Sequence, residues 1–200
     1  MIFLDEDDEL FQQVIRAVQG IYARKDSAHD LEHALRVRAW GKKLAAEEGA
    51  ESIIVELAAL LHDIGRSGAV EKTHAESSAG LAVNILQKCG TAQTVITKVR
   101  DAIIAHSREA GYEPETLESK VLYDADKLDF VGPMGLARLF VLAGVQGWAI
   151  VGSNSCEEFY LERISHYGEH LYTPAAKRYF EPLFAYMEDF WNQLRVQRLK

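Results

Sequence analysis

The chain contains 200 residues, of which 48% are hydrophobic and 26% are charged, and its formal net charge is −8. This length and balance predict one globular domain with a hydrophobic core. The acidic charge argues against duplex nucleic acid as the main partner, because no basic stripe is available to neutralise its phosphates, but it leaves room for a local positive pocket that binds a small phosphorylated ligand.

The first part of the chain is predicted to form three helices, because its apolar residues recur every three or four positions. The first helix begins near Leu10 and ends at Gly20. The second covers residues 27–48 and stops at Gly49, and the third covers residues 51–64.

The middle of the chain continues this helical spacing. Thr73 and Glu76 form a T-x-x-E capping box, which predicts that a helix starts at THAESSAGLAVNIL. The apolar residues between Val95 and Ile104 predict another amphipathic helix, with His106 near its end.

The last part of the chain is also predicted to be helical. The stretch SKVLYDADKLDF predicts a short helix that the Gly132–Pro133 pair interrupts before a helix resumes over residues 134–143. Residues 144–156 are the clearest predicted loop and a candidate mobile lid. The tail from Pro174 to Leu199 predicts a long helix with the proline in its first turn.

The whole pattern predicts an all-α chain. No stretch alternates between apolar and polar residues as a half-buried strand would, and no repeat or linker divides the sequence. We therefore expect a single domain over residues 1–200, with a core over about residues 20–140 and C-terminal helices over residues 157–199 packed on it.

Three observations favour a cytoplasmic chain without a membrane partner. The start MIFLDEDDEL lacks the basic residues and long apolar stretch of a signal peptide. The most apolar long segment, GLARLFVLAGVQGWAIVG, is interrupted by Arg138 and Gln146, which favours a buried helix and a turn over a membrane span. Cys89 and Cys156 lie far apart in no metal-binding pattern, which is typical of free thiols.

The pattern HDLEH places His29 and His33 four residues apart on a helix, the spacing found in zinc proteases. A protease would carry glutamate directly after the first histidine, and Asp30 stands there instead. No third ligand follows at a protease spacing, so we expect His29 to be an ordinary surface histidine.

A more convincing set of polar residues spans several predicted helices. His33, His62, Asp63 and Asp126 each lie on or at the end of a helix that has an apolar face. A bundle that packs those faces together would turn the four side chains inward at one level. Two imidazoles and two carboxylates suit a divalent ion such as Mn, Mg, Co, Ni, Fe or Zn and leave positions open for water and substrate.

The segments DLEHALRV, LLHDIG and YDADKLDFVG present these residues in the order H…HD…D and resemble the HD-domain metal-dependent phosphohydrolase superfamily. With THAESSA, GLARLF and LYTPAAKRYF, they resemble small bacterial HD hydrolases of the nucleotide pyrophosphohydrolase type over about residues 20–195. The resemblance implies an all-α HD helical bundle that hydrolyses a phosphoester or phosphoanhydride, with a nucleotide as favoured substrate. It implies that His33, His62, Asp63 and Asp126 are the metal ligands.

The sequence departs from some nucleotide-specific members of that superfamily at one position. Those members place a water-positioning glutamate three residues after the HD aspartate, where this chain has Arg66. Arg66 is expected either to contact substrate phosphate, which its planar guanidinium suits, or to act as a cation at a helix C-terminus.

His74 and His106 extend the order to H…HD…H…H…D, which resembles dinuclear HD proteins and di-iron HD oxygenases. We favour one metal ion over two, so that these histidines contact phosphate or move protons. The alternatives to a phosphohydrolase are a dinuclear-iron oxygenase and a non-catalytic binding module.

Other charged and aromatic residues are expected to support the site or the core. Lys127 follows the fourth ligand directly and is expected to contact phosphate. Asp129 is expected to form a hydrogen bond with Lys127 or with a metal ligand, and not to bind the metal itself. Arg36 and Arg138 are candidates for contact with an anion, but exposed salt bridges are the expected role of each. An aromatic series at helical spacing predicts packing or contact within a homodimer, and comprises Tyr179, Phe180, Phe184, Tyr186, Phe190 and Trp191.

Overall fold

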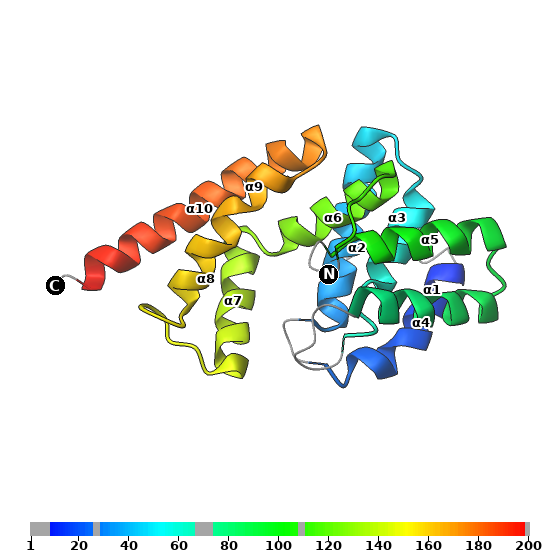
Figure 1. Cartoon of the computed structure of the whole chain (residues 1–200), viewed down its shortest axis with the longest axis horizontal. Helices are drawn as coiled ribbons and strands as arrows, with labels where there is room; N and C mark the ends of the chain where they lie inside the picture. The colour runs from blue at the N-terminus through cyan, green and yellow to red at the C-terminus, as the bar shows by residue number, and fades with distance from the viewer. Residues whose placement is uncertain (1–8, 26–28, 67–73, 108–110, 199–200) are drawn as a thin grey trace.

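The computed structural model of the chain describes residues 9–25, 29–66, 74–107 and 111–198 (Figure 1). Apart from an isolated bridge between Ala149 and Ser155, the regular secondary structure in these ranges is helical, which confirms the predicted all-α class. The helices are α1 (Glu9–Tyr22), α2 (Leu31–Glu48), α3 (Ser52–Leu61), α4 (His74–Lys88), α5 (Gln93–Ala105), α6 (Leu117–Asp129), α7 (Gly132–Gln146), α8 (Cys156–Glu162), a 3-10 turn (Ile164–His166), α9 (Tyr167–His170) and α10 (Pro174–Arg198).

The ends of α1 and α2 show where the predicted boundaries hold and where they fail. The predicted stop at Gly20 is wrong, because α1 continues to Tyr22, whose buried hydroxyl donates a hydrogen bond to the carbonyl of Leu60 over 3.1 Å. This tertiary contact offsets the cost of about 1 kcal/mol for glycine inside a helix. Helix α2 begins later than predicted, after Asp30 as N-cap, and ends as predicted at Gly49, whose φ of 79° is the left-handed conformation.

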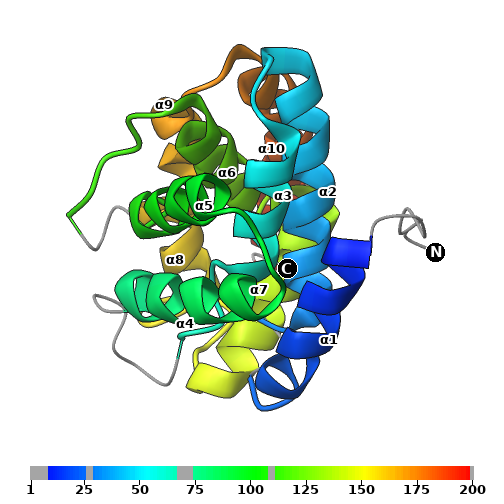
Figure 2. The ribbon, with the colours of Figure 1, turned by 90° about the vertical axis from the view of Figure 1, so that its right-hand side faces the viewer.

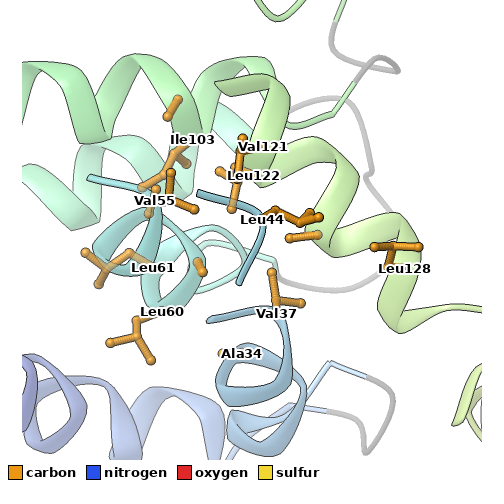
Figure 3. Close-up of a cluster of buried hydrophobic side chains, with 14 of the residues drawn as sticks. Ala34, Val37, Leu44, Val55, Leu60, Leu61, Ile103, Val121, Leu122 and Leu128 are labelled. Carbon is orange, nitrogen blue, oxygen red and sulfur yellow. The ribbon is translucent and has the colours of Figure 1, made fainter. Parts of the chain in front are cut away.

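Helix α3 is the centre of the core, packing against α1, α2, α5 and α6. Its buried residues run without interruption from Ile54 to Leu61. Figure 3 shows Val55 and Leu61 of this helix among the side chains of Leu44, Ile103 and other neighbours. The helix ends at Leu61, three residues before the predicted end, so the two polar residues that follow lie in a turn anchored to the most buried helix of the protein.

Helices α4 and α5 pack side by side in both views, beside α3 (Figure 1 and Figure 2). Helix α4 begins at His74 and carries Glu76 in its first turn. The other half of the predicted capping box, Thr73, lies outside the described residues.

The C-terminal helices form the other side of the molecule. The chain turns by 74° between α6 and α7, where Gly132 has a φ of 75° and Pro133 occupies the first turn of α7, at the predicted interruption. Helix α10 packs against α7, α6 and α2 (Figure 1). Trp191 and Phe180 of its aromatic series are buried and pack in the core, whereas Tyr186 is exposed.

The connection between α7 and α8 is shorter than the loop predicted over residues 144–156, because α7 extends to Gln146. Backbone hydrogen bonds brace the connection, including one from the N–H of Cys156 to the carbonyl of Ala149 over 2.9 Å. Among the described residues, none of the helices is by itself long and apolar enough to cross a membrane; α6 and α7 satisfy the length and composition test only as a bent pair.

Candidate metal centre

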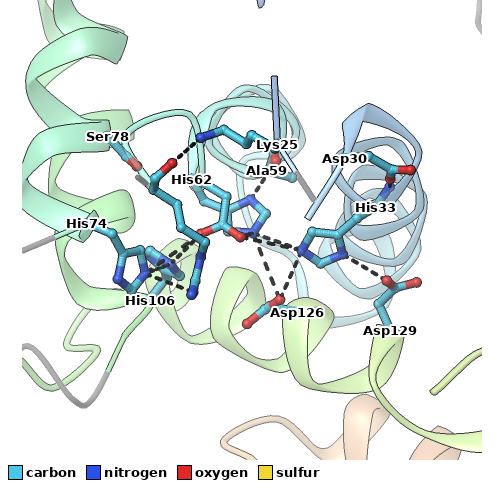
Figure 4. Close-up of polar contacts among 12 residues, drawn as sticks. Lys25, Asp30, His33, Ala59, His62, His74, Ser78, His106, Asp126 and Asp129 are labelled. Atoms are coloured by element: carbon cyan, nitrogen blue, oxygen red, sulfur yellow. Dashed lines mark hydrogen bonds and ion pairs between the residues drawn. The ribbon is translucent and has the colours of Figure 1, made fainter. Parts of the chain in front are cut away.

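His33 enters the centre from the first turn of α2. The side chain of Asp30 accepts a hydrogen bond from the backbone N–H of His33 over 2.9 Å and so caps the helix. The His33 side chain is buried, and its Nδ1 lies 2.8 Å from Asp129 Oδ2. This contact orients the ring so that Nε2 points into the centre (Figure 4).

His62 and Asp63 enter from the turn that follows α3. Nδ1 of His62 lies 2.8 Å from the carbonyl oxygen of Ala59, so the ring donates there and presents Nε2 to the centre. Both side chains are buried. Because successive side chains on a helical turn diverge, the adjacent pair reaches the centre from two directions.

The structure brings together the four residues of the H…HD…D set. Nε2 of His33 lies 3.2 Å from Nε2 of His62, and these atoms lie 3.9 Å and 3.6 Å, respectively, from Asp63 Oδ2. Asp126 of α6 places Oδ1 at 3.5 Å from His33 Nε2 and 3.9 Å from His62 Nε2 (Figure 4). His33, His62 and Asp63 present atoms close enough together to hold a divalent ion. Asp126 Oδ1 lies beside both imidazole nitrogens and is the candidate fourth ligand.

A second group of possible ligands shares Asp63. Nε2 of His74, at the start of α4, lies 3.2 Å from Nε2 of His106, at the end of α5. Asp63 Oδ1 lies 3.7 Å from the first of these nitrogens and 3.9 Å from the second. The two oxygens of Asp63 therefore face two different histidine pairs.

The electrostatics of the centre fit a cation. Burial lowers the pKa of His33 to about 4 and that of His106 to about 3, so both rings are neutral near pH 7 and carry a lone pair for a metal. Burial alone would raise the pKa of Asp63, but His62 and Arg66 hold it well below its usual value. Lys127 and His62 likewise lower the pKa of Asp126 against the effect of burial. The neutral imidazoles of His33 and His106 beside ionised carboxylates are suitable donors for a divalent metal.

Asp129 contacts His33 from outside the centre. Its carboxylate accepts hydrogen bonds from Nε of Arg36 and from Nη1 of Arg138, each over 2.8 Å, besides the contact with His33. The exposed salt bridge expected for Arg138 is wrong: this side chain is 5% exposed, because the 74° turn between α6 and α7 brings it against the buried Asp129. The side chain of Arg36 is 22% exposed and pairs with the same carboxylate, so it too belongs to this cluster.

The two predicted phosphate-contacting cations border the centre. Nε of Arg66 lies 3.3 Å from Asp63 Oδ1, and its Nη2 lies 3.4 Å from His74 Nε2. Lys25 donates a hydrogen bond to the backbone carbonyl of Arg66 and holds the turn in place. Nζ of Lys127 lies 3.0 Å from Asp126 Oδ2.

The centre opens into a cavity of about 1670 Å³ between α1, the turn after α3 and α4 on one side and α7 and α8 on the other. Asp63, His74, His106 and Asp126 contribute to its lining. The cavity is also lined by the cationic side chains Arg24, Lys25, Arg66, Lys127, Arg138 and Arg163. Four acidic side chains, Asp63, Asp126, Glu158 and Glu162, line it as well. The cationic side chains outnumber the acidic ones at this cavity although the whole chain is acidic, which suits an anionic ligand.

A family model described as HD domain matches residues 30–131, about half of the chain. The matched segment contains the four residues of the H…HD…D set, and also His74 and His106. The chain belongs to the HD domain family.

Relatives extend the HD likeness over nearly the whole chain. YpgQ of Bacillus subtilis is 27% identical over 186 residues, which are 92% of this chain and 91% of YpgQ. The crystal structure of YpgQ in complex with ADP has a TM-score of 0.78 at 26% identity, covering 94% of this chain and 95% of that one. An HD-superfamily hydrolase from Bacillus thuringiensis has a TM-score of 0.74 at 25% identity, covering 94% and 96%. This chain therefore has the fold of the HD-superfamily hydrolases.

Sequence reasoning missed His29 as part of the HD site. We expected a surface histidine, but the half-buried ring of His29 lines the cavity, with its centroid 6.1 Å from that of His33. The proximity of the two residues in HDLEH could have indicated this. No comparable signal marks Arg24, Trp148 or Arg163, which packing alone brings to the cavity.

Proposed function

We propose that this chain is a divalent-metal-dependent phosphohydrolase that acts on a small phosphorylated molecule, with a nucleotide as the favoured substrate. The observation that carries the proposal is the meeting of imidazole and carboxylate donors in a cavity that several cations also line. The ADP in the crystal structure of YpgQ supports a nucleotide as the ligand.

His33, His62, Asp63 and Asp126 would hold the ion. The chemistry that a bound divalent ion supplies in such a site is polarisation of a phosphoryl oxygen and a lower pKa for the water that attacks phosphorus. The nitrogen and oxygen donors suit Mn, Mg, Co, Ni, Fe or Zn. Asp129 would keep the ring of His33 in the orientation that points Nε2 at the ion.

Arg66 and Lys127 would bind the phosphate. Their charged groups lie beside the two carboxylates of the centre, within 3.3 Å and 3.0 Å, respectively. A guanidinium contacts two phosphate oxygens at once, and an ammonium adds a localised positive charge. Both groups would stabilise the negative charge that grows on the phosphoryl oxygens in the transition state.

We favour a single ion because the positive charge of Arg66 lies beside the second group of possible ligands, which is Asp63, His74 and His106. Its guanidinium lies close both to Asp63 Oδ1 and to His74 Nε2, where a second divalent cation would meet a positive charge. His74 and His106 would then orient substrate oxygens or water by hydrogen bonds, or transfer protons. The cytoplasmic location and a homodimer stay predictions from the sequence.

The deciding experiment measures metal content and hydrolysis together. A panel of nucleotides and other phosphoesters is incubated with Mn²⁺, Co²⁺, Ni²⁺ or Mg²⁺, and phosphate is resolved from pyrophosphate among the products. We expect His62→Ala and Asp63→Ala to lose both bound metal and hydrolysis. His166→Ala, at an exposed histidine on the 3-10 turn, is the matched control and should retain both.

Other outcomes would contradict the proposal. A variant that lost its metal but kept full hydrolytic activity would overturn it. Two irons per chain with consumption of O₂ would favour the dinuclear oxygenase. Failure to hydrolyse any compound with any of the four ions would favour a non-catalytic binding module.

A further inference from the structure

Aromatic side chains line the cavity on the wall opposite α1 and α4. Trp148 follows α7 and Phe159 lies on α8; their ring centroids are 5.2 Å apart and their planes differ by 32°. Phe130, at the end of α6, continues the row with its centroid 6.1 Å from that of Phe159. All three rings are half-buried and line the cavity, so they are only partly used in packing the core.

This row is connected to the metal centre by a series of contacts. The guanidinium of Arg138 lies 4.7 Å from the ring centroid of Phe130. The same guanidinium donates to Asp129, which holds His33. These contacts reach His33 from the side opposite the centre, but Asp63 and Asp126 of the centre line the same cavity as the three rings. One cavity therefore gives a ligand whose phosphate lies at the centre room to place its other end on the aromatic row.

Charged side chains of both signs lie at the end of the row, where Glu158, Glu162 and Arg163 line the cavity. Arg163 lies over Phe159, with its guanidinium carbon 5.4 Å from the ring centroid. Planar guanidinium groups and aromatic rings both stack well on nucleobases, whereas they offer little to a purely polar sugar phosphate.

The backbone holds Trp148 in place before any ligand arrives. Gly147 adopts the left-handed conformation with a φ of 70°, and the N–H of Trp148 then donates to the carbonyl of Ala143 over 2.9 Å. The next residue, Ala149, bridges to Ser155.

A capping box secures the far end of the same connection. The N–H of Glu158 donates to Ser155 Oγ over 3.1 Å, and the Glu158 carboxylate accepts from the N–H of Asn154 over 2.6 Å. A wall held in this way loses little conformational entropy when a ligand binds.

We propose that Trp148 and Phe159 form the surface on which the nucleobase of the substrate stacks. The inference rests on the proposed function for the identity of the phosphate end. Stacking on one aromatic side chain is tolerant of base identity, because every base has a π-face. The wall therefore distinguishes nucleotides from phosphates that carry no base, and it contributes to affinity more than to the chemical step.

The test compares two ligands that carry the same two phosphates, ADP and pyrophosphate. Their affinities for the full chain are measured by isothermal titration calorimetry, with and without Mn²⁺. We expect the wild type to bind ADP about tenfold or more tightly than pyrophosphate. Trp148→Ala should weaken ADP binding by about tenfold and leave pyrophosphate binding within about twofold of the wild type.

Two further variants keep the test valid if Trp148→Ala does not fold. Trp148→Leu retains apolar volume but removes the π-face, and should also lose ADP affinity. Phe159→Leu should do the same at the second ring. The matched control is Trp40→Ala, since Trp40 is a half-buried tryptophan on α2 that packs on Tyr179 and does not line the cavity.

The outcomes separate this inference from the proposed function, because the titrations without Mn²⁺ measure binding in the absence of turnover. Equal affinity of the wild type for ADP and pyrophosphate, or unchanged ADP affinity in a folded Trp148→Leu, would overturn the stacking surface even if hydrolysis is found. Loss of ADP affinity in the variants would support it even if the wild type hydrolyses nothing.

Discussion

His33 Nδ1 lies 2.8 Å from Asp129 Oδ2, on the side of the ring opposite the nitrogen that faces the metal centre. The carboxylate that orients the ring is 2% exposed and also accepts hydrogen bonds from Arg36 and Arg138. One buried aspartate thus connects a proposed metal ligand on α2 to Arg138 on α7. This aspartate is not part of the His62–Asp63 pair.

Replacing this aspartate should weaken metal binding without removing a ligand. We expect Asp129→Asn to lower metal affinity by about 10- to 100-fold, because the amide orients the His33 ring less firmly and reduces its basicity. The variant should also unfold more easily, by about 3 kcal/mol, since Arg138 is left buried beside a neutral group. Competition with a chelator measures the affinity, and thermal melting the stability.

The control for that change is Asp101→Asn, at a half-exposed aspartate of α5 that pairs with Arg100 on the surface. It should leave metal affinity within about twofold of the wild type. A folded Asp129→Asn protein with the metal affinity of the wild type would show that the hydrogen bond to His33 does not serve the centre.

Arg66 should control how many ions the chain binds. We expect the wild type to bind one Mn²⁺ per chain and Arg66→Gln to bind two, because the substitution removes the positive charge beside Asp63 Oδ1 and His74. Equilibrium dialysis followed by elemental analysis gives the stoichiometry. Two ions in the wild type, or one ion in both proteins, would refute the proposal that Arg66 prevents a second ion from binding at Asp63, His74 and His106.

Gly65 should be required because α4 passes directly over the turn that carries His62 and Asp63. A Cβ at Gly65 would lie 2.3 Å from the backbone nitrogen of Ser78, and backbone atoms have no room to move aside. We expect Gly65→Ala to destabilise the protein by about 2 kcal/mol, a fall in Tm of roughly 4–8 °C. Differential scanning calorimetry measures the change.

The matched control is Gly80→Ala on α4. A Cβ at Gly80 meets nothing within 4 Å, and alanine is a better helix former, so this variant should be as stable as the wild type or more stable by up to about 1 kcal/mol. Equal stability of the Gly65→Ala and wild-type proteins would contradict this expectation. It would mean that α4 can move away from the turn that carries Gly65 with little loss of free energy of unfolding.

The metal-free protein should lose stability as the pH falls from about 6.5 towards 4. Burial lowers the pKa of His33 to about 4 and that of His106 to about 3, whereas an unfolded histidine titrates near 6.5. Between these values the unfolded chain binds more protons than the folded one, so the free energy of unfolding decreases with falling pH. For His33 alone the loss is on the order of 3 kcal/mol.

Urea denaturation in the presence of a chelator, repeated from pH 7.5 to 4.5, tests this dependence. His106→Asn should flatten the profile, because one of the two titrating rings is removed. A free energy of unfolding that stays constant over this range would contradict the expected burial of neutral imidazoles.

Much of the fold was predictable because it follows from local chemistry. Apolar spacing of three to four residues locates the helices, and Gly49 and the Gly132–Pro133 pair end or interrupt them where a left-handed or proline-compatible backbone is needed. Gly20 was misleading, because the buried hydroxyl of Tyr22 extends α1 past it. At Gly20 the tertiary contact of Tyr22 outweighs the low helix propensity of glycine, and the spacing of apolar residues does not reveal such a contact.

The candidate ligands were also accessible from the sequence, since His33, the His62–Asp63 pair and Asp126 are polar groups on otherwise apolar helices. Burying such groups is costly unless they meet one another or an ion, so their position on the inward faces predicts that they converge. Only the tertiary structure decided the rest. Arg138 changes from an expected surface residue to a buried partner of Asp129 because the 74° turn between α6 and α7 brings the two side chains together. Trp148 and His29 reach one cavity from distant parts of the chain, because packing brings together segments whose sequences do not depend on each other.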